Sequence, residues 1–147
     1  MKQNLFYKYL LYAEDDPDDQ HLFNEAMQSI DDAIQIKIVS NGLLLLQYLN
    51  DLSPGHPLPS CIVLDINMPV WDGIQALQAI KADEKFKGIP VCILTTSSSQ
   101  KEQQLCAELG IDAFFTKPLK RDEMLMIGRK IAQLCSEVEQ KTTNSRF

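Results

Sequence analysis

Hydrophobic residues along the chain fall into runs of two kinds. Four short runs are mainly apolar or aromatic, whereas a fifth alternates between apolar and polar residues. Continuous runs are typical of strands buried on both faces, and a period of two indicates a half-exposed strand near a sheet edge. The expected strands lie at 7–13, 34–39 (the alternating run), 61–64, 91–95 and 112–116.

Segments with a helical period separate these runs, and several carry start or stop signals. Asp16 fits an N-cap with Pro17 at the first helical position, and Ser99 with Glu102 has the spacing of a capping box. Gly110 fits the end of that helix. The expected helices lie at 17–30, 42–49, 72–85, 98–110 and 122–138.

The order of elements is five strand–helix units in succession. This order predicts an α/β fold, in which a parallel sheet carries helices on both faces and right-handed crossovers join the strands. In such sheets the functional crevice lies at the carboxyl ends of the strands. The leucine run at 43–46 is wider than one helical face, so we expect a well-buried helix there rather than a partner site.

Composition narrows the function classes. The 147 residues suit one domain, and 45% hydrophobic with 23% charged residues is an ordinary globular composition. A net charge of -6 without a basic run argues against nucleic-acid binding and against a polybasic membrane anchor. The scattered cysteines include no CxxC pair, and we find no signal peptide, so we expect a reduced, cytoplasmic protein. The cysteines are Cys61, Cys92, Cys106 and Cys135.

Polar side chains follow four of the expected strands. Glu14 and Asp15 come after the first strand and Asp65 after the third, while Thr95 ends the fourth and Lys117 follows the fifth. Carboxylates gathered at one rim repel each other, and a divalent cation removes that conflict. A few hard oxygen ligands completed by water suit Mg²⁺. The sequence therefore predicts a magnesium site at this rim.

Four motifs at these strand ends carry a family resemblance. They are "AEDD", "LDINMPVWDG", "ILTTS" and "FFTKP", and the spacings between Asp65, Thr95 and Lys117 match as well. Residues 7–138 resemble the receiver domain of a two-component response regulator, in particular small stand-alone regulators such as phytochrome-associated ones. The resemblance implies a flavodoxin-like, doubly wound sheet of five parallel strands in the order 2-1-3-4-5, with five helices.

The resemblance also implies a role for each site residue. Asp65 would accept a phosphoryl group from a histidine kinase or histidine phosphotransferase. Lys117, before a cis peptide at Pro118, would contact one phosphoryl oxygen, and Thr95 would donate its hydroxyl to another. The Mg²⁺ ligands would be the carboxylates of Glu14, Asp15 and Asp65 and the backbone carbonyl of Asn67.

A conformational switch is the other implication. Phosphorylation would draw Thr95 inward, and Phe114 on the last strand would follow it. The surface of the fourth helix, fifth strand and fifth helix would then change for a downstream partner or a homodimer. Such a module catalyses only its own phosphorylation and dephosphorylation, so we do not expect an enzyme. Only a polar, frayed tail, 139–147, follows residue 138, and we expect output through a partner rather than an attached domain.

Two positions depart from the family pattern. Glu14 stands where aspartate is commoner and is one methylene longer, and Thr96 replaces the usual alanine or glycine, where its bulk would restrict access to Asp65. The neighbouring acids Asp16, Asp18 and Asp19 fit a solvated helix start, favoured by the helix dipole.

Three other functions compete on the same fold. A phosphohydrolase working through an aspartyl phosphate needs an acid two residues after its nucleophile, and Asn67 stands there. A flavodoxin-like cofactor carrier needs hydroxyls or amides in its first strand-end loop, where "YAEDDPDD" would repel a phosphate. An unphosphorylated interaction module would not need the complete set of acids, threonine and lysine.

Overall fold

A computed structural model describes the chain from residue 8 to residue 144, with side chains described as far as residue 136. Strands and helices alternate strictly. The strands are β1 (Tyr9–Ala13), β2 (Gln35–Val39), β3 (Cys61–Leu64), β4 (Val91–Thr95) and β5 (Ala113–Thr116). The helices are α1 (Pro17–Ile30), α2 (Gly42–Asn50), α3 (Gly73–Ala82), α4 (Gln100–Leu109) and α5 (Arg121–Asn144).

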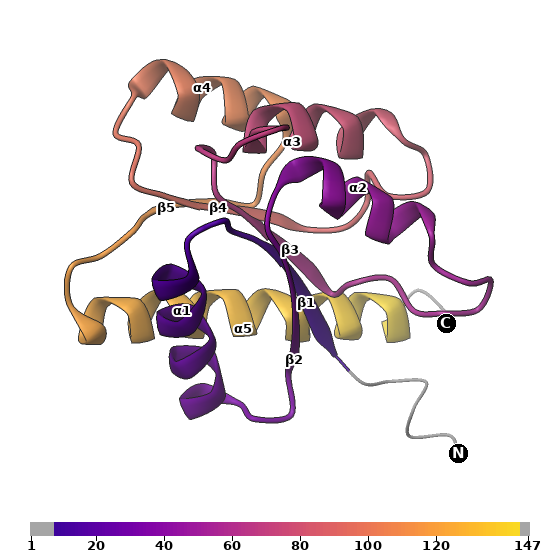
Figure 1. Cartoon of the computed structure of the whole chain (residues 1–147). Coiled ribbons are helices and arrows are strands. Elements are labelled where there is room, and N and C mark those ends of the chain that lie inside the picture. The colour runs from indigo at the N-terminus through magenta and orange to yellow at the C-terminus, as the bar shows by residue number, and fades with distance from the viewer. Residues whose placement is uncertain (1–7, 145–147) are drawn as a thin grey trace.

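The five strands form one parallel sheet in the order β2-β1-β3-β4-β5. Helices α2, α3 and α4 cover one face of this sheet, and α1 and α5 cover the other (Figure 1). The two layers enclose separate hydrophobic clusters, one built around Leu45, Leu77 and Ile93 and the other around Phe23, Met27 and Leu94. The doubly wound fold and strand order expected from the sequence are confirmed.

Burial along the strands follows their position in the sheet. The central strands β1, β3 and β4 are buried throughout, whereas β2 at one edge alternates between exposed and half-buried residues. The alternating pattern at 34–39 therefore identified the edge strand correctly. The leucine run was misinterpreted, because Leu43 and Leu44 are 36% and 41% exposed while Leu45 is buried.

Several element boundaries differ from the sequence-based expectation. Strand β1 begins at Tyr9, while residue 7 lies outside the described part of the chain. Helix α3 ends at Ala82 because the carboxylate of Asp83 accepts a hydrogen bond from the Lys85 N–H, an alternative to the helical bond. Helix α5 continues to Asn144, where a frayed tail was expected from residue 139. In the described part of the chain, no helix combines the length and apolar character needed to span a membrane.

Side-chain caps fix the starts of the helices around the site. Asp16 accepts hydrogen bonds from the N–H groups of Asp18 and Asp19, as its predicted N-cap role requires. A complete capping box occurs at Asp72 and Gln75. At α4 only half of the expected box forms, because the Glu102 carboxylate accepts from the Ser97 hydroxyl.

The connection from β3 to α3 folds back tightly onto the end of β3. The Gly73 N–H donates to the carbonyl of Ile66 (2.9 Å), so the first turn of α3 lies against the residue that follows Asp65. A methyl group on Gly73 would lie 2.1 Å from the backbone carbonyl oxygen of Asp65. Only glycine permits this approach, which sets the position of Asp65.

Replacing Gly73 with alanine should therefore destabilise the fold. The added methyl group meets backbone rather than a flexible side chain, so we expect the free energy of unfolding to fall by about 1–3 kcal/mol. Urea denaturation of Gly73→Ala measures this loss. Gly88→Ala is the matched control, because a methyl group added there would meet no atom within 4 Å beyond its chain neighbours. Equal stability of the two variants would refute the steric argument.

Candidate functional site

The site lies where the central strands end. Glu14 directly follows β1 and Asp65 follows β3, and the Asp65 N–H donates to the carbonyl of Ala13 (3.1 Å). Thr95 ends β4, and its carbonyl accepts from the N–H of Lys117 just beyond β5 (2.7 Å). The sheet's own hydrogen bonds thus bring four of the predicted residues to one rim.

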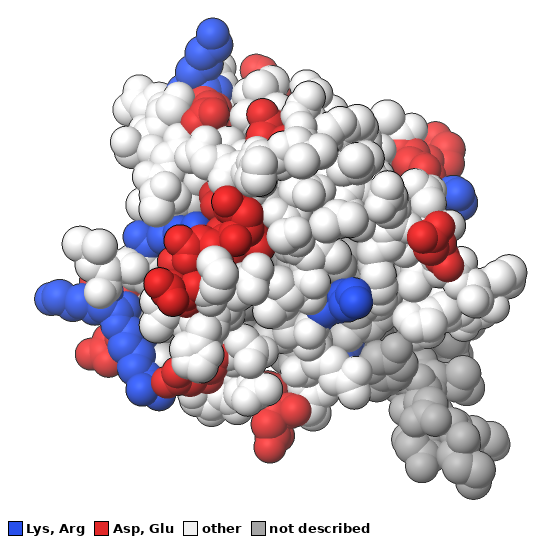
Figure 2. Space-filling model, in the orientation of Figure 1, with Lys and Arg blue, Asp and Glu red and all other residues white. Residues whose placement is uncertain are grey.

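Three carboxylates form a compact group at this rim. Ligand oxygens of Glu14, Asp15 and Asp65 all lie within 4.8 Å of one another. Glu14 and Asp65 are buried, whereas Asp15 is exposed. Acidic side chains gather on the surface where β1 leads into α1 (Figure 2). An all-oxygen group of this kind, open to water on the Asp15 side, fits a hard divalent cation.

Glu14 is held from several directions. Its carboxylate accepts from the Tyr12 hydroxyl (3.3 Å) and from the Asp16 N–H (3.1 Å), and it pairs with Lys117 (2.6 Å). Burial raises the pKa of Glu14 to about 7, although the bonds from Lys117 and Asp16 act in the opposite direction. Burial, with the adjacent Glu14 charge, also raises the pKa of Tyr12, which therefore stays protonated as a donor.

Lys117 is the cation of the site. Its Nζ lies 2.6 Å from Glu14, 2.7 Å from Asp19 and 3.1 Å from Asp65. Burial alone would lower the pKa of Lys117, but hydrogen bonds to Asp19 and Glu14 and the Asp65 charge outweigh it and raise the pKa. Asp19 was expected to be a solvated helix-start residue, and its contact with Lys117 corrects that interpretation. In the sequence, only the position of Asp19 in the first turn of α1, beside the acidic loop, could have indicated that it reaches the site.

The remaining predicted residues surround this group. Thr95 is fully buried, and its Oγ1 accepts from the Ser97 N–H (3.2 Å), a bond that leaves the hydroxyl proton for another acceptor. The Asn67 N–H donates to Asp65 Oδ1 (3.4 Å). Phe114 is half-buried and packs against the cluster beneath α2, α3 and α4.

The peptide before Pro118 is trans, because the described part of the chain contains no cis peptide bond. The cis bond implied by the family resemblance is therefore wrong for this structure. A trans bond is the lower-energy form of an X–Pro peptide, and Lys117 still reaches the three carboxylates from it.

The loop after Asp65 contains a strained residue. Val70 has a φ of 69° and is 68% exposed, although β-branched residues rarely adopt this left-handed conformation. Trp71 follows it, is half-buried, and accepts a hydrogen bond from the Gly42 N–H through its carbonyl (3.0 Å). Strain of this kind costs about 1–3 kcal/mol and is common in functional loops.

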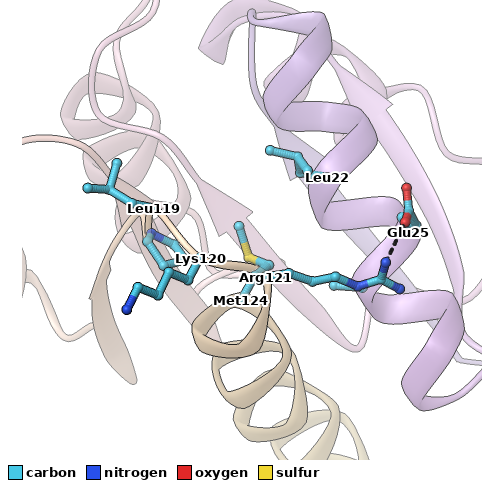
Figure 3. Close-up of a pocket in the computed structure, with 8 residues that line it drawn as sticks. Leu22, Glu25, Leu119, Lys120, Arg121 and Met124 are labelled. Atoms are coloured by element: carbon cyan, nitrogen blue, oxygen red, sulfur yellow. Dashed lines mark ion pairs between the residues drawn. The ribbon is translucent and has the colours of Figure 1, made fainter.

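A small pocket lies between α1 and the connection from β5 to α5. The pocket is about 170 Å³ in volume, and Pro118, the residue after Lys117, contributes to its lining. Leu22 and Met124 give the pocket an apolar wall, and the ion pair between Arg121 and Glu25 (3.3 Å) joins its two sides (Figure 3). The pocket is therefore an apolar hollow with a charged margin, and none of the three grouped carboxylates lines it.

Comparisons with known proteins agree on one family. Residues 10–127 match the family described as the response regulator receiver domain. Response regulator Rcp1 of Synechocystis sp. is 31% identical over 112 residues, covering 75% of this chain and 76% of Rcp1. The structure of the phosphorylated cyanobacterial phytochrome response regulator RcpA has a TM-score of 0.78 at 27% identity, covering 86% of this chain and 91% of RcpA. The structure of the Mn²⁺-bound form of Rcp1 has a TM-score of 0.76 at 28% identity, covering 84% of this chain and 91% of the Rcp1 chain.

The raised pKa of Glu14 predicts that cation binding depends on pH. Below a pKa of about 7 the carboxyl group is increasingly protonated, and a cation must displace that proton to bind. We expect the affinity for Mg²⁺ to fall between about pH 8 and about pH 6, approaching a tenfold loss per pH unit below the pKa. Isothermal titration calorimetry at several pH values measures this trend.

Glu14→Gln provides the control for this prediction. This variant removes the titrating ligand, so it should bind Mg²⁺ more weakly and lose most of the pH dependence in this range. An affinity of the wild type that stayed constant over the same range would contradict the assigned role of Glu14.

Proposed function

The chain belongs to the receiver domain family of two-component response regulators, and from this premise we propose that it accepts a phosphoryl group on Asp65 in a Mg²⁺-dependent reaction. One observation carries the proposal. The buried Asp65 carboxylate lies 3.1 Å from the Lys117 ammonium and shares a 4.8 Å group with Glu14 and Asp15. A nucleophile, a cation site and a fixed positive charge therefore converge on one point.

Phosphoryl transfer needs alignment and charge neutralisation more than covalent help from the protein. An Asp65 carboxylate oxygen attacks the phosphorus of a phosphohistidine, the P–N bond breaks, and the histidine nitrogen keeps the bonding pair and takes up a proton. Lys117 neutralises one phosphoryl oxygen, and Thr95 donates its hydroxyl proton to another. Mg²⁺, held by Glu14, Asp15, Asp65 and the Asn67 carbonyl, would supply further charge neutralisation.

We assign the donor role to a histidine kinase or histidine phosphotransferase, the donors from which receiver domains of this family take their phosphoryl group. The pocket lined by Pro118, the residue after Lys117, supports this role, because it offers a partner protein an apolar hollow between α1 and the start of α5 (Figure 3). A cytoplasmic location agrees with four cysteines that are free and buried in the structure and would stay reduced there.

The proposed reaction makes the protein a switch rather than an enzyme with a separate substrate. Phosphorylated Asp65 offers Thr95 a new acceptor, and a move of Thr95 inward opens space that Phe114 follows. Phe114 lies on β5 in register with Ile93 of β4, so its displacement alters the surface formed by α4, β5 and α5. This surface would bind a downstream protein or a second copy of the chain.

The phosphoacceptor assignment can be tested with beryllofluoride, which stands in for the phosphoryl group. Beryllofluoride with Mg²⁺ should change the fluorescence of Trp71, the single tryptophan, because Trp71 lies in the loop that follows Asp65. The change should require both reagents and should disappear in Asp65→Asn. A response that persisted in Asp65→Asn would refute the assignment.

Two further measurements separate the competing functions. Sustained turnover of small phosphate esters would favour a phosphohydrolase, although Asn67 cannot transfer the required proton. Flavin that copurifies with the protein would favour a cofactor carrier. Absence of any response to Mg²⁺ and beryllofluoride in a folded wild type would leave an unphosphorylated interaction module.

The proposed switch predicts where the backbone responds. NMR spectra with Mg²⁺ and beryllofluoride should show chemical-shift changes across residues 95–119, with a clear change at Phe114. In Thr95→Ser, which keeps the hydroxyl, the change at Phe114 should persist. In Thr95→Ala it should shrink at saturating beryllofluoride, because the hydroxyl that couples the two residues is absent. Unchanged shifts at Phe114 in the saturated wild type would rule out this coupling.

A further inference from the structure

The ammonium group of Lys117 is shared among three carboxylates, and one of them has no other task in the site. Glu14 and Asp65 belong to the acidic group suited to a cation, and Asp15 completes that group. Among the described residues Asp19 is not a member of this group, yet its Oδ2 lies 2.7 Å from Lys117 Nζ. Asp19 therefore contacts the lysine without contributing to the cation site.

Asp19 approaches the lysine from a separate element. It lies in the first turn of α1, where its N–H donates to Asp16 Oδ1 (3.2 Å), whereas Asp65 follows β3. The Lys117 side chain is 9% exposed and that of Asp19 is 32% exposed. A pair this sheltered is screened less by salt than a pair on the open surface. The contact consequently ties α1 to the lysine at the centre of the site.

We propose that Asp19 competes with the phosphoryl group for Lys117 and so limits how tightly the phosphorylated state is held. This inference rests on the proposed phosphoacceptor function of Asp65. An ammonium has three N–H donors, and Glu14, Asp19 and Asp65 offer three acceptors. After transfer, the phosphoryl group on Asp65 takes the place of the Asp65 carboxylate at the ammonium and shares it with Glu14 and Asp19.

Once a cation is bound, Asp19 is the carboxylate that still competes fully for the lysine. The charges of Glu14 and Asp65 are compensated when a cation binds to the acidic group, whereas the Asp19 charge keeps its full attraction for the lysine. Removing that charge weakens the hold on one N–H of the ammonium and also removes a negative charge near the incoming anion. Both effects act in the same direction and favour the phosphoryl group.

Asp19→Asn tests this competition, because it removes the charge and keeps the size of the side chain. With Mg²⁺ saturating, beryllofluoride should bind about three- to tenfold more tightly than to the wild type. Asp18→Asn is the matched control, since it removes the same charge from the neighbouring, exposed position on α1. Its affinity for beryllofluoride should stay within about twofold of the wild type. Affinity for Mg²⁺ alone should be similar in the two variants, because neither residue belongs to the cation group.

The outcomes distinguish this inference from the function on which it rests. A wild type that binds no beryllofluoride refutes the phosphoacceptor function itself. A wild type that binds, with Asp19→Asn no tighter than Asp18→Asn, refutes the competition alone. Weaker binding by Asp19→Asn also overturns it, because Asp19 would then orient Lys117 for the phosphoryl group. Asp19→Ser, a second uncharged variant, should tighten binding as well, and thermal unfolding checks that each variant is folded.

Discussion

The structure depends on the balance between buried negative charge and one lysine at the carboxyl end of a parallel sheet. Two of the carboxylates that contact Lys117, those of Glu14 and Asp65, are buried, where repulsion and desolvation oppose ionisation. Lys117 offsets part of this cost, and a bound cation would offset more. The pKa of Glu14 is raised to about 7, because the hydrogen bonds from Lys117 and Asp16 offset only part of the effect of burial. A site left in this condition is suited to gaining a cation, which would offset the charge of the proposed phosphoryl group as well.

Parallel topology is what makes such a concentration of charge possible. Each strand of the sheet ends at the same rim, so residues distant in the sequence meet there without a dedicated scaffold. The Asp65 N–H bonds to Ala13 and the Gly73 N–H bonds to Ile66, so backbone contacts hold Asp65 and the residue that follows it. The fold therefore supplies alignment, and the side chains need only supply charge.

The proximity of the candidate site residues could be predicted because these residues follow recognisable strands. Glu14, Asp65 and Lys117 come immediately after apolar runs, and the topology then decides where they meet. The same reasoning failed where a side chain's environment depends on a neighbouring element. Asp19 carries the signature of a solvated helix start, and only the approach of Lys117 from beyond β5 gives it a different partner. The leucines of α2 are a second example. The helical period predicts which residues share a face of the helix, but not whether a neighbouring element buries that face.

One backbone hydrogen bond has a consequence for how this protein can diverge. The Lys117 N–H bonds to the Thr95 carbonyl, and these residues lie at the ends of the paired strands β4 and β5. The distance between them is therefore set by the strand ladder and is independent of the chain that links the two strands. An insertion after the C-terminal end of α4 should be tolerated during evolution, whereas a single residue added within β5 would shift Lys117 out of the site.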